Sequence, residues 1–469
     1  MTRNGWEPVI GLEIHVQLKT RTKMFCRCEN LWGEPENTRT CPVCLAHPGA
    51  LPVPNEKAIA WTVKLGLALG CEIAPRAFFH RKHYVYPDLP KGYQISQYDQ
   101  PLCTEGGFLL PGEDGDREIG IVRVHLEEDT AKSVHVGGAG GRIAGAEYSL
   151  VDFNRGGTPL VEIVTKPDVR SAEEARLFLQ LLRQTVVELG ISDAEMEKGS
   201  LRCDANVSVR KAGETGFRTK TELKNMNSFK FVADGIAAEV TRQAALYDAG
   251  EAVVQQTLHF DPATGSLALL RRKEEADDYR YFPEPDLVPL EPSAQLVEAA
   301  RAEIGELPGA RIRRLEEEIG FDLAEGLVTS GRDALFERVP GDRRAVANVL
   351  MNQLAAAGVD PAPVDGEELG KLIEARERIP RQAFLEALAA SGEPGFVAEK
   401  YMGEAAITDR AELERIVDDV LAENESQVEA YRAGKEGLLG FFVGQVMKRT
   451  NGKADARIVN ELVREKLTA

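Results

Sequence analysis

Val9-Ile-Gly-Leu-Glu-Ile-His-Val-Gln-Leu18 is the stretch that decides the fold of this chain. Its hydrophobic residues alternate with Glu13, His15 and Gln17. Because successive side chains of a β-strand point to opposite faces, this alternation predicts a strand with one apolar face and one face that carries the three polar groups. A carboxylate and an imidazole two residues apart can bind one divalent cation or act as an acid–base pair. A solvent-facing strand surface would show the same pattern, so this segment alone leaves both interpretations open.

Four cysteines follow this strand as two tight pairs, Cys26-x-Cys28 and Cys41-x-x-Cys44, with twelve residues between the pairs. Paired thiols around a short loop have the spacing of a structural zinc site. The chain has seven cysteines, and clustering of four of them fits a reducing compartment in which thiols bind metal or are buried. The sequence therefore predicts a zinc loop over residues 26–44, and a set of reduced thiols without metal is the alternative.

The length of 469 residues is too great for one ordinary core and predicts two or three domains, for which a hydrophobic content of 43% is sufficient. The N-terminus carries no apolar signal stretch, and no run of about eighteen apolar residues occurs in the chain. We therefore expect a cytoplasmic protein.

Residues up to about 290 have the mixture of strand and helix patterns that is typical of an α+β domain. Strands are predicted at residues 9–18, 119–126, 160–164 and 205–209, and helices at residues 57–69 and 172–189. Since strands and helices do not alternate regularly, antiparallel or mixed pairing is favoured over a doubly wound parallel sheet.

The mixed pattern ends at a stretch with two prolines, Asp286–Ser293. Beyond it the hydrophobic residues recur at helical spacing, for example in residues 293–304 and 366–377. A weaker break lies at residues 403–408. The sequence therefore predicts an α+β domain over residues 1–292, a helical domain over residues 293–405 and a small helical tail domain over residues 406–469.

The formal net charge of −18 argues against non-specific attraction to nucleic acid. The tail is a local exception, because residues 433–469 hold seven cations and four anions. Three glycines, Gly437, Gly440 and Gly444, interrupt an apolar run in this tail. Glycine is unfavourable within a helix, so they predict close helix packing or, less strongly, the close approach of another backbone.

Further acids add to the polar strand. Glu127, Glu128 and Asp129 end a second strand, and Glu162 lies in an apolar strand, where a buried carboxylate needs a metal ion or an Arg as partner. An edge-strand position facing water would also explain Glu162. Glu13, His15, Glu162 and one acid of the 127–129 cluster could together form a magnesium site of the kind that holds phosphates. The phosphate-binding candidates, in the absence of a Walker motif, are Arg81, Lys82, Lys132 and Arg155.

Several longer motifs occur in a fixed order along the chain. They are Tyr84-x-Tyr-Pro-Asp88, Leu150-Val-Asp-x-Asn-Arg155, Thr158-Pro-Leu-x-Glu-Ile-Val164, Leu201-Arg-Cys-Asp204 and Tyr279-Arg-Tyr-Phe-Pro-Glu-Pro-Asp286. With the Val9–His15 segment, the acid cluster and the glycine-spaced tail, they closely resemble the B-subunit family of the bacterial glutamyl/aspartyl-tRNA(Gln/Asn) amidotransferases. The resemblance covers essentially the whole chain.

The resemblance implies a first domain, the cradle, whose antiparallel sheet is similar to that of glutamine synthetase. It implies a ligase that uses ATP to convert the side-chain carboxylate of misacylated Glu-tRNA(Gln), Asp-tRNA(Asn) or both into an acyl phosphate. Ammonia then displaces the phosphate. The ammonia comes through a channel from a partner amidase, the A subunit, and the small C subunit holds the heterotrimer together. A non-catalytic, zinc-stapled tRNA-binding scaffold of the same complex is the alternative function.

Site residues also follow from the resemblance. The family's catalytic magnesium ligands correspond to Glu13, His15, Glu128 and Glu162, although strand alternation alone does not favour Glu128 over Glu127. Zinc occurs in only some members of the family, and all four cysteines are present here. The tail is expected to recognise the tRNA elbow through its cations, which are Lys448, Arg449, Lys453 and Arg457. An ordinary solvated helix face is the alternative for these cations.

Overall fold

The structure is a computed structural model that describes residues 5–138, 145–272, 279–402, 407, 409–450 and 452–468. The chain forms two compact units, Met1–Arg311 and Ile312–Ala469, which are described separately. Among the described residues, no helix combines the length and the hydrophobicity needed to cross a membrane.

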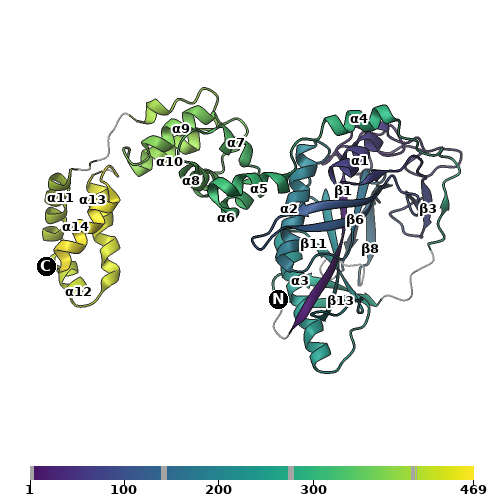
Figure 1. Cartoon of the computed structure of the whole chain (residues 1–469), viewed down its shortest axis with the longest axis horizontal. Helices are drawn as coiled ribbons and strands as arrows, with labels where there is room; N and C mark the ends of the chain where they lie inside the picture. Colours follow the sequence, from purple (N-terminus) through teal and green to yellow (C-terminus); the bar gives the residue numbers. More distant parts are fainter. Residues whose placement is uncertain are drawn as a thin grey trace. The chain divides into compact units, whose positions relative to one another are not determined.

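A nine-stranded sheet organises the first unit, with the strand order β13-β12-β11-β10-β1-β9-β6-β5-β2 (Figure 1). Its strands are β1 (Trp6–Gln17), β2 (Glu72–Ile73), β5 (Cys103–Leu110), β6 (Arg117–Glu128), β9 (Pro159–Thr165), β10 (Leu201–Lys211), β11 (Thr221–Met226), β12 (Gln256–Asp261) and β13 (Ser266–Arg272). Only the β11–β12 pair is parallel among the described pairs of this sheet. The expectation of antiparallel or mixed pairing is therefore confirmed, and β1 lies at the centre of the sheet as its alternating sequence requires.

Three helices cover the apolar face of this sheet: α1 (Glu56–Ala68), α2 (Ala172–Glu188) and α3 (Phe229–Asp248). Each begins at a capping residue whose side chain accepts hydrogen bonds from the first turn, namely Asn55, Ser171 and Ser228. The residues of β1 that face the helices are almost fully buried, and Ile10 and Ile14 are both 0% exposed. The opposite face of the sheet is therefore left to the polar side chains.

Two smaller sheets accompany the large one. The strands β3 (His80–His83), β4 (Tyr93–Ser96) and β14 (Phe282–Pro283) form a three-stranded sheet beside β6, and β7 (Lys132–Val136) pairs with β8 (Tyr148–Asp152) in a hairpin. These elements carry many of the polar motifs found in the sequence.

The compact units divide after Arg311, whereas the sequence places a domain boundary near residue 292. The difference arises because α4 (Ala294–Ala302) packs against α1 of the first unit. In addition, the Lys64 ammonium donates to Glu303 at 2.7 Å and to the Leu189 carbonyl at 3.0 Å. The three-domain division stays a prediction, and of the expected break at residues 403–408 only Ile407 lies within the described residues.

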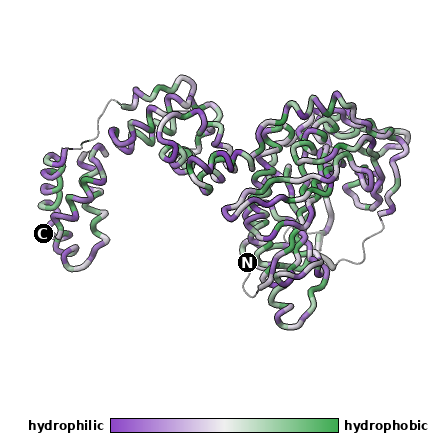
Figure 2. The backbone as a smooth tube through the Cα atoms, in the orientation of Figure 1, coloured by the Kyte–Doolittle hydropathy of each residue, from purple (hydrophilic) through white to green (hydrophobic). Residues whose placement is uncertain are grey.

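Helices dominate the second unit, as predicted. They include α5 (Pro308–Ile319, which begins in the first unit), α6 (Phe321–Thr329), α7 (Asp333–Arg338), α8 (Arg343–Asn348), α9 (Gly366–Ala375), α10 (Arg381–Ala390), α11 (Arg410–Glu423), α12 (Glu425–Arg432), α13 (Leu439–Arg449) and α14 (Ala456–Thr468). Hydrophobic and hydrophilic residues alternate along these helices (Figure 2). Such alternation lets each helix bury one side.

The last four helices share one hydrophobic core, which includes Leu413, Phe442, Val446 and Leu462. The three glycines of this region do not contribute to it. A Cβ atom added at Gly437, Gly440 or Gly444 would meet nothing within 4 Å among the described residues. The prediction that these glycines allow close helix packing within the bundle is therefore wrong, because all three lie on the exposed surface.

Candidate active site and zinc loop

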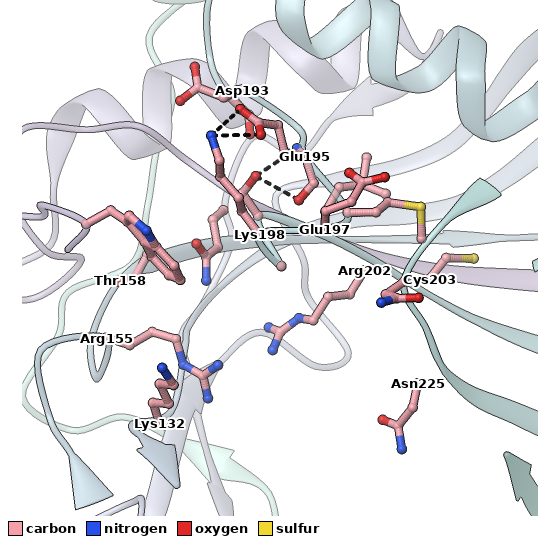
Figure 3. A pocket seen from close by; sticks show the side chains of 18 of the residues that line it. Lys132, Arg155, Thr158, Asp193, Glu195, Glu197, Lys198, Arg202, Cys203 and Asn225 are labelled. Atoms are coloured by element: carbon pink, nitrogen blue, oxygen red, sulfur yellow. Dashed lines mark hydrogen bonds and ion pairs between the residues drawn. The ribbon is translucent and has the colours of Figure 1, made fainter. Parts of the chain in front are cut away.

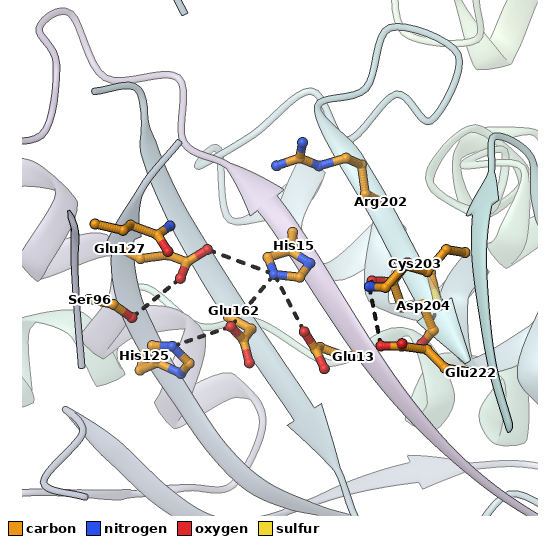
Figure 4. A network of polar contacts seen from close by, with 12 residues as sticks. Glu13, His15, Ser96, His125, Glu127, Glu162, Arg202, Cys203, Asp204 and Glu222 are labelled. Carbon is orange, nitrogen blue, oxygen red and sulfur yellow. Dashed lines mark hydrogen bonds and ion pairs between the residues drawn. The ribbon is translucent and has the colours of Figure 1, made fainter. Parts of the chain in front are cut away.

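The polar face of the large sheet gathers side chains from strands that are distant in sequence (Figure 4). His15 on β1 lies opposite Glu162 on β9, and Glu162 lies opposite His125 on β6. Residues directly opposite each other in an antiparallel pair share a face and have neighbouring Cβ atoms. Cross-strand register therefore brings these residues together.

Acids and imidazoles form the centre of this face. The His15 Nε2 atom lies 3.8 Å from a Glu13 carboxylate oxygen, 3.7 Å from one of Glu127 and 3.6 Å from one of Glu162. The His125 Nε2 atom lies 3.4 Å from the same Glu162 oxygen. We call these five residues the acid–imidazole cluster.

Burial and mutual charge shift the ionisation of the acid–imidazole cluster. Burial raises the pKa of Glu127 to about 7, with the Glu162 charge adding to the effect, and it also raises the pKa of Glu13. Burial lowers the pKa of His125 to about 4, so this imidazole is neutral at pH 7. For His15, burial acts in the same direction, but a hydrogen bond to Glu162 and the surrounding carboxylates prevail and raise its pKa to about 9. The acids thus hold more negative charge than one imidazolium can offset.

A divalent cation fits this arrangement. Ligand atoms of Glu13, His15 and Glu162 all lie within 4.8 Å of one another, and those of His125, Glu127 and Glu162 do so as well. Carboxylate oxygens are the ligands that magnesium prefers, and a cation would offset the burial and the mutual repulsion that raise the pKa values of Glu13 and Glu127. The cluster therefore contains three of the four residues expected to hold magnesium, and their role as ligands stays a prediction.

The fourth expected ligand, Glu128, lies elsewhere. A register shift between Ile121 and Arg123 on β6 turns Arg123, His125 and Glu127 toward the polar face. Glu128 consequently points the other way, where it accepts hydrogen bonds from the Lys91 ammonium and, at 3.0 Å, from the Ile95 amide. The structure thus brings Glu127 rather than Glu128 into the cluster. The shift is a β-bulge, which changes the face of every later residue in the strand and is not visible in simple alternation.

A large pocket of about 1090 Å³ (Figure 3) is lined by Arg202 and Asp204, which lie opposite His15 and Glu13 of the acid–imidazole cluster in the β1–β10 pair. Its lining includes Gln17, Lys132, Arg155 and Arg202. Arg202 lies opposite His15 in the β1–β10 pair, so it belongs both to the pocket and to the polar face (Figure 4).

One corner of this pocket carries surplus positive charge. The buried Asp129 carboxylate accepts a hydrogen bond from Gln17 at 2.7 Å and from Arg202 at 3.2 Å, and it lies 3.8 Å from Arg155 Nε. Although burial opposes ionisation, the two guanidinium groups hold the pKa of Asp129 below its ordinary value. One carboxylate offsets only one of the two guanidinium groups. Lys132 lines the same pocket and lies opposite Asp152 in the β7–β8 pair, so three cations face two acids here. This cationic corner is suited to phosphate.

The four cations predicted to bind phosphate lie in three different surroundings. Lys132 and Arg155 line the pocket. The Lys82 ammonium lies 5.1 Å from the centre of the Tyr279 ring. The charges of Glu127 and Glu162 raise the pKa of Lys82 although burial lowers it, so Lys82 lies near the acid–imidazole cluster. Arg81, by contrast, donates to both carboxylate oxygens of the buried Glu284 at 2.7 Å. That bidentate ion pair gives Arg81 a structural role.

Sequence reasoning missed two members of this site, His125 and Arg202, and left the choice between Glu127 and Glu128 to the resemblance. His125 and Glu127 belong to the motif Arg123–Asp129, but only the bulge decides which way they point. Arg202 occurs in the Leu201–Asp204 motif, where its approach to Asp129 depends on a residue 73 positions away. No local signal in the sequence could have found that contact.

The zinc loop has the geometry that four thiolate ligands require. The sulfur atoms of Cys26, Cys28, Cys41 and Cys44 all lie within 4.8 Å of one another, and those of Cys41 and Cys44 are 3.8 Å apart. Four ligands at about 2.3 Å in a tetrahedron around zinc place sulfur atoms about 3.8 Å apart. A hydrogen bond from Cys26, reinforced by the charge of Lys23, lowers the pKa of Cys44 to about 5, so this sulfur is a thiolate at neutral pH. The four residues fit a zinc ion.

The predicted tail cations lie at the end of α13 and around the start of α14. Lys448 and Arg457 are exposed, whereas Arg449 forms an ion pair with Glu423 at 2.9 Å. Lys453 is half-buried. The structure thus places all four near one helix junction, and their role in tRNA binding stays a prediction.

Comparison with known proteins agrees with this architecture. The family model described as the GatB/GatE catalytic domain matches residues 8–298, and that described as the GatB domain matches residues 341–467. Among curated proteins, the B subunit of the aspartyl/glutamyl-tRNA(Asn/Gln) amidotransferase of Moorella thermoacetica is 49% identical and covers 98% of this chain and 100% of its own length. The proteins of the same name from Syntrophotalea carbinolica and Geotalea daltonii are 45% and 46% identical, cover 99% and 98% of this chain, and each match over 99% of their own length. The chain described here therefore belongs to the GatB family of tRNA-dependent amidotransferase subunits.

Proposed function

We propose that this chain performs ATP-dependent transamidation of misacylated Glu-tRNA(Gln), Asp-tRNA(Asn) or both. The observation that carries the proposal is the acid–imidazole cluster next to a pocket with a cationic corner. A site for a divalent cation beside a site for phosphate is the arrangement that phosphoryl transfer requires.

The chemistry has two steps. A carboxylate is a poor acyl donor, since oxide is a poor leaving group, so the substrate carboxylate oxygen first attacks the γ-phosphorus of ATP and ADP departs. Ammonia then attacks the carbonyl carbon of the acyl phosphate, the C–O bond to phosphate breaks, and an amide and inorganic phosphate result. Magnesium, when bound, would neutralise charge on the transferring phosphoryl group. Glu13, His15, Glu127 and Glu162 are the residues that would hold it.

The chain's own residues would orient the reactants. Arg155, Arg202 and Lys132 would face phosphate oxygens. Asp129 accepts a hydrogen bond from Arg202, and the Arg155 guanidinium donates to the carbonyls of Thr130 and Ala131, both at 2.8 Å. Ammonia is nucleophilic only when unprotonated, which favours its delivery from a partner amidase, the A subunit, through a closed path. The proposed assembly also contains the small C subunit, and zinc would fix the 26–44 loop.

The test that separates this function from that of a tRNA-binding scaffold is magnesium-dependent ATP hydrolysis on misacylated tRNA by the assembled complex. We expect hydrolysis with the natural chain and its loss with Glu13→Ala. Hydrolysis that is equally fast with Glu13→Ala would place the chemistry in a partner and support the scaffold.

We expect the magnesium affinity of the acid–imidazole cluster to rise with pH. His15 has a raised pKa of about 9 and Glu127 one of about 7, so at pH 6 both carry a proton that the metal must displace. Each displaced proton makes the magnesium affinity rise by up to about tenfold per pH unit. Between pH 7 and 9 only His15 is still largely protonated. The affinity should therefore rise by up to about a hundredfold over this range. Calorimetric titrations of magnesium in buffers of different ionisation enthalpy would measure it, and His15→Gln should flatten the dependence above pH 7. An affinity that is constant from pH 6 to 9 would contradict the assignment.

For the tail, we expect the double change Lys448→Gln and Arg457→Gln to weaken tRNA binding and lower the salt dependence of affinity. Both cations are exposed, and each phosphate contact removed reduces the slope of log affinity against log salt by about 1. Filter binding of tRNA at several salt concentrations would measure this. Arg464→Gln, another exposed cation of α14, is the matched control, and deletion of residues 408–469 should have the larger effect while partner glutaminase activity persists. Equal slopes for the double variant and the control would remove these two residues from the tRNA interface.

A further inference from the structure

The lining of the large pocket also includes residues of the zinc loop that lie between its two cysteine pairs. Leu31 and Trp32 line the pocket there, and Trp32 is 69% exposed. Tryptophan is usually largely covered in folded proteins, because its large ring gains from burial. Within the described ranges, no aromatic ring stacks on the Trp32 indole and no cation lies over it. Most of the indole is therefore open to a ligand in the pocket.

Polar contacts on both sides fix the backbone that carries Trp32. Before it, the Asn30 amide donates to the carbonyls of Leu18 at 3.1 Å and Thr20 at 3.3 Å. After it, the Asn154 amide donates to the Pro35 carbonyl at 2.7 Å. These contacts tie the loop to the end of β1 and to the turn after β8. Trp32 is thus presented by a segment that is already ordered, which lowers the entropy cost of using its ring for binding.

The other parts of the pocket indicate what the ring would bind. Arg155 and Arg202 share the single Asp129 carboxylate, and Lys132 lies in the same lining. The pocket lining as a whole contains seven acids and five cations, so phosphates fit only at the cationic corner. That corner and an unstacked indole in the same lining match a ligand that has both phosphates and a flat ring. The pocket volume of about 1090 Å³ is ample for such a ligand.

We propose that Trp32 is a nucleobase-stacking residue and that this pocket takes a nucleoside phosphate. The phosphates face Arg155, Arg202 and Lys132, and the base lies on the indole. The inference rests on the proposed function for the source of the nucleotide, which is either free ATP or the single-stranded end of the RNA substrate. Both sources present the same chemistry to the pocket.

Tryptophan fluorescence of the assembled complex tests the proposal directly. The chain has only three tryptophans, of which Trp6 is buried and Trp61 lies on α1 outside the pocket lining. The probes are a non-hydrolysable ATP analogue with magnesium and the RNA trinucleotide CCA. We expect at least one probe to quench the emission, the quench to disappear in Trp32→Phe and to persist in Trp61→Phe.

Binding affinities, measured by calorimetry with the same probes, complete the test. Trp32→Leu should weaken binding of the quenching probe about tenfold, because it removes the stacking ring, whereas Trp32→Phe should retain most of the affinity. Leu31→Ala is the matched control, since Leu31 lines the same pocket without an aromatic ring. A quench by the ATP analogue alone assigns the site to the free nucleotide, a quench by CCA alone assigns it to the RNA end, and a quench by both shows that the pocket accepts either.

Two results would overturn the proposal. The first is that neither probe causes a quench that depends on Trp32. This result counts against the proposal even if another protein of the complex covers Trp32 and shifts its emission on assembly. The other is equal affinity of Trp32→Leu and the natural chain for the quenching probe. Neither readout needs amide formation, so a failure of the proposed transamidation would remain distinguishable from a failure of this inference.

Discussion

Glu162→Gln is expected to reduce amide transfer by about a thousandfold, since it removes the carboxylate at the centre of the acid–imidazole cluster. Glu162 lies within 3.6 Å of His15 and 3.4 Å of His125, so its loss disturbs both candidate ligand groups at once. Glutamine has the same shape but no charge, so the fold should be kept. The measurement is the rate at which the assembled complex converts Glu-tRNA(Gln) or Asp-tRNA(Asn) in the presence of ATP, magnesium and glutamine.

A second readout separates this role from a structural one. The hydrogen bond and charge of Glu162 help to raise the pKa of His15 to about 9, so Glu162→Gln should lower that pKa, as followed by NMR of the imidazole. Glu118→Gln provides the control, because Glu118 is an exposed acid at the other end of β6. Undiminished transamidation by both Glu162→Gln and Glu13→Ala at ordinary magnesium concentration would sink the assignment of the metal site.

Loss of zinc from the cysteine loop is the second large effect that we expect. Protein purified without chelator should contain about one zinc ion per chain, and Cys41→Ser should abolish binding, because a structural zinc site contributes about 10–16 kcal/mol of apparent binding free energy that is coupled to local folding. Most of residues 26–44 are exposed or only half-buried, so the loop has little apolar packing to replace the metal. Elemental analysis and hydrogen exchange over residues 24–53 would measure both consequences.

The control for the zinc loop is Cys71→Ser, which changes a buried thiol outside the loop and should leave the zinc content unchanged. Far-UV circular dichroism of Cys41→Ser should stay close to that of the natural chain, since the large sheet does not include the loop. If the natural protein carries no metal, the four cysteines are reduced thiols and the loop is held by its polar contacts alone.

Much of the architecture could be read from local patterns. The strand at the centre of the sheet, two of the three helices that cover it (α1 and α2) and the change to a helical second half were predicted from periodicity, and the structure confirms them. The spacing of Cys26, Cys28, Cys41 and Cys44 predicted that the four thiols meet, and they do. In each case the signal lies within one strand, helix or loop.

The sequence was less informative wherever a long-range contact decides the outcome. Arg81 was expected to bind phosphate, but Glu284, 203 positions away, forms a buried ion pair with it. The glycines of α13 and the turn before it were expected to pack against a neighbouring helix, yet the helical core forms without them and leaves them exposed. Composition alone could not show which surface the bundle would bury.

By itself, the sequence determined the polar face of β1, with Glu13 and His15 on it, and the thiol cluster, because both depend on spacing along a few residues. Only the tertiary structure decided that Glu127 rather than Glu128 joins these groups and that Arg202 comes to lie opposite His15. The physical reason is that a bulge and the register between strands are set by pairing with segments far away in the chain. A shift of one residue in that pairing moves a carboxylate from one face of the sheet to the other, and no local pattern records it.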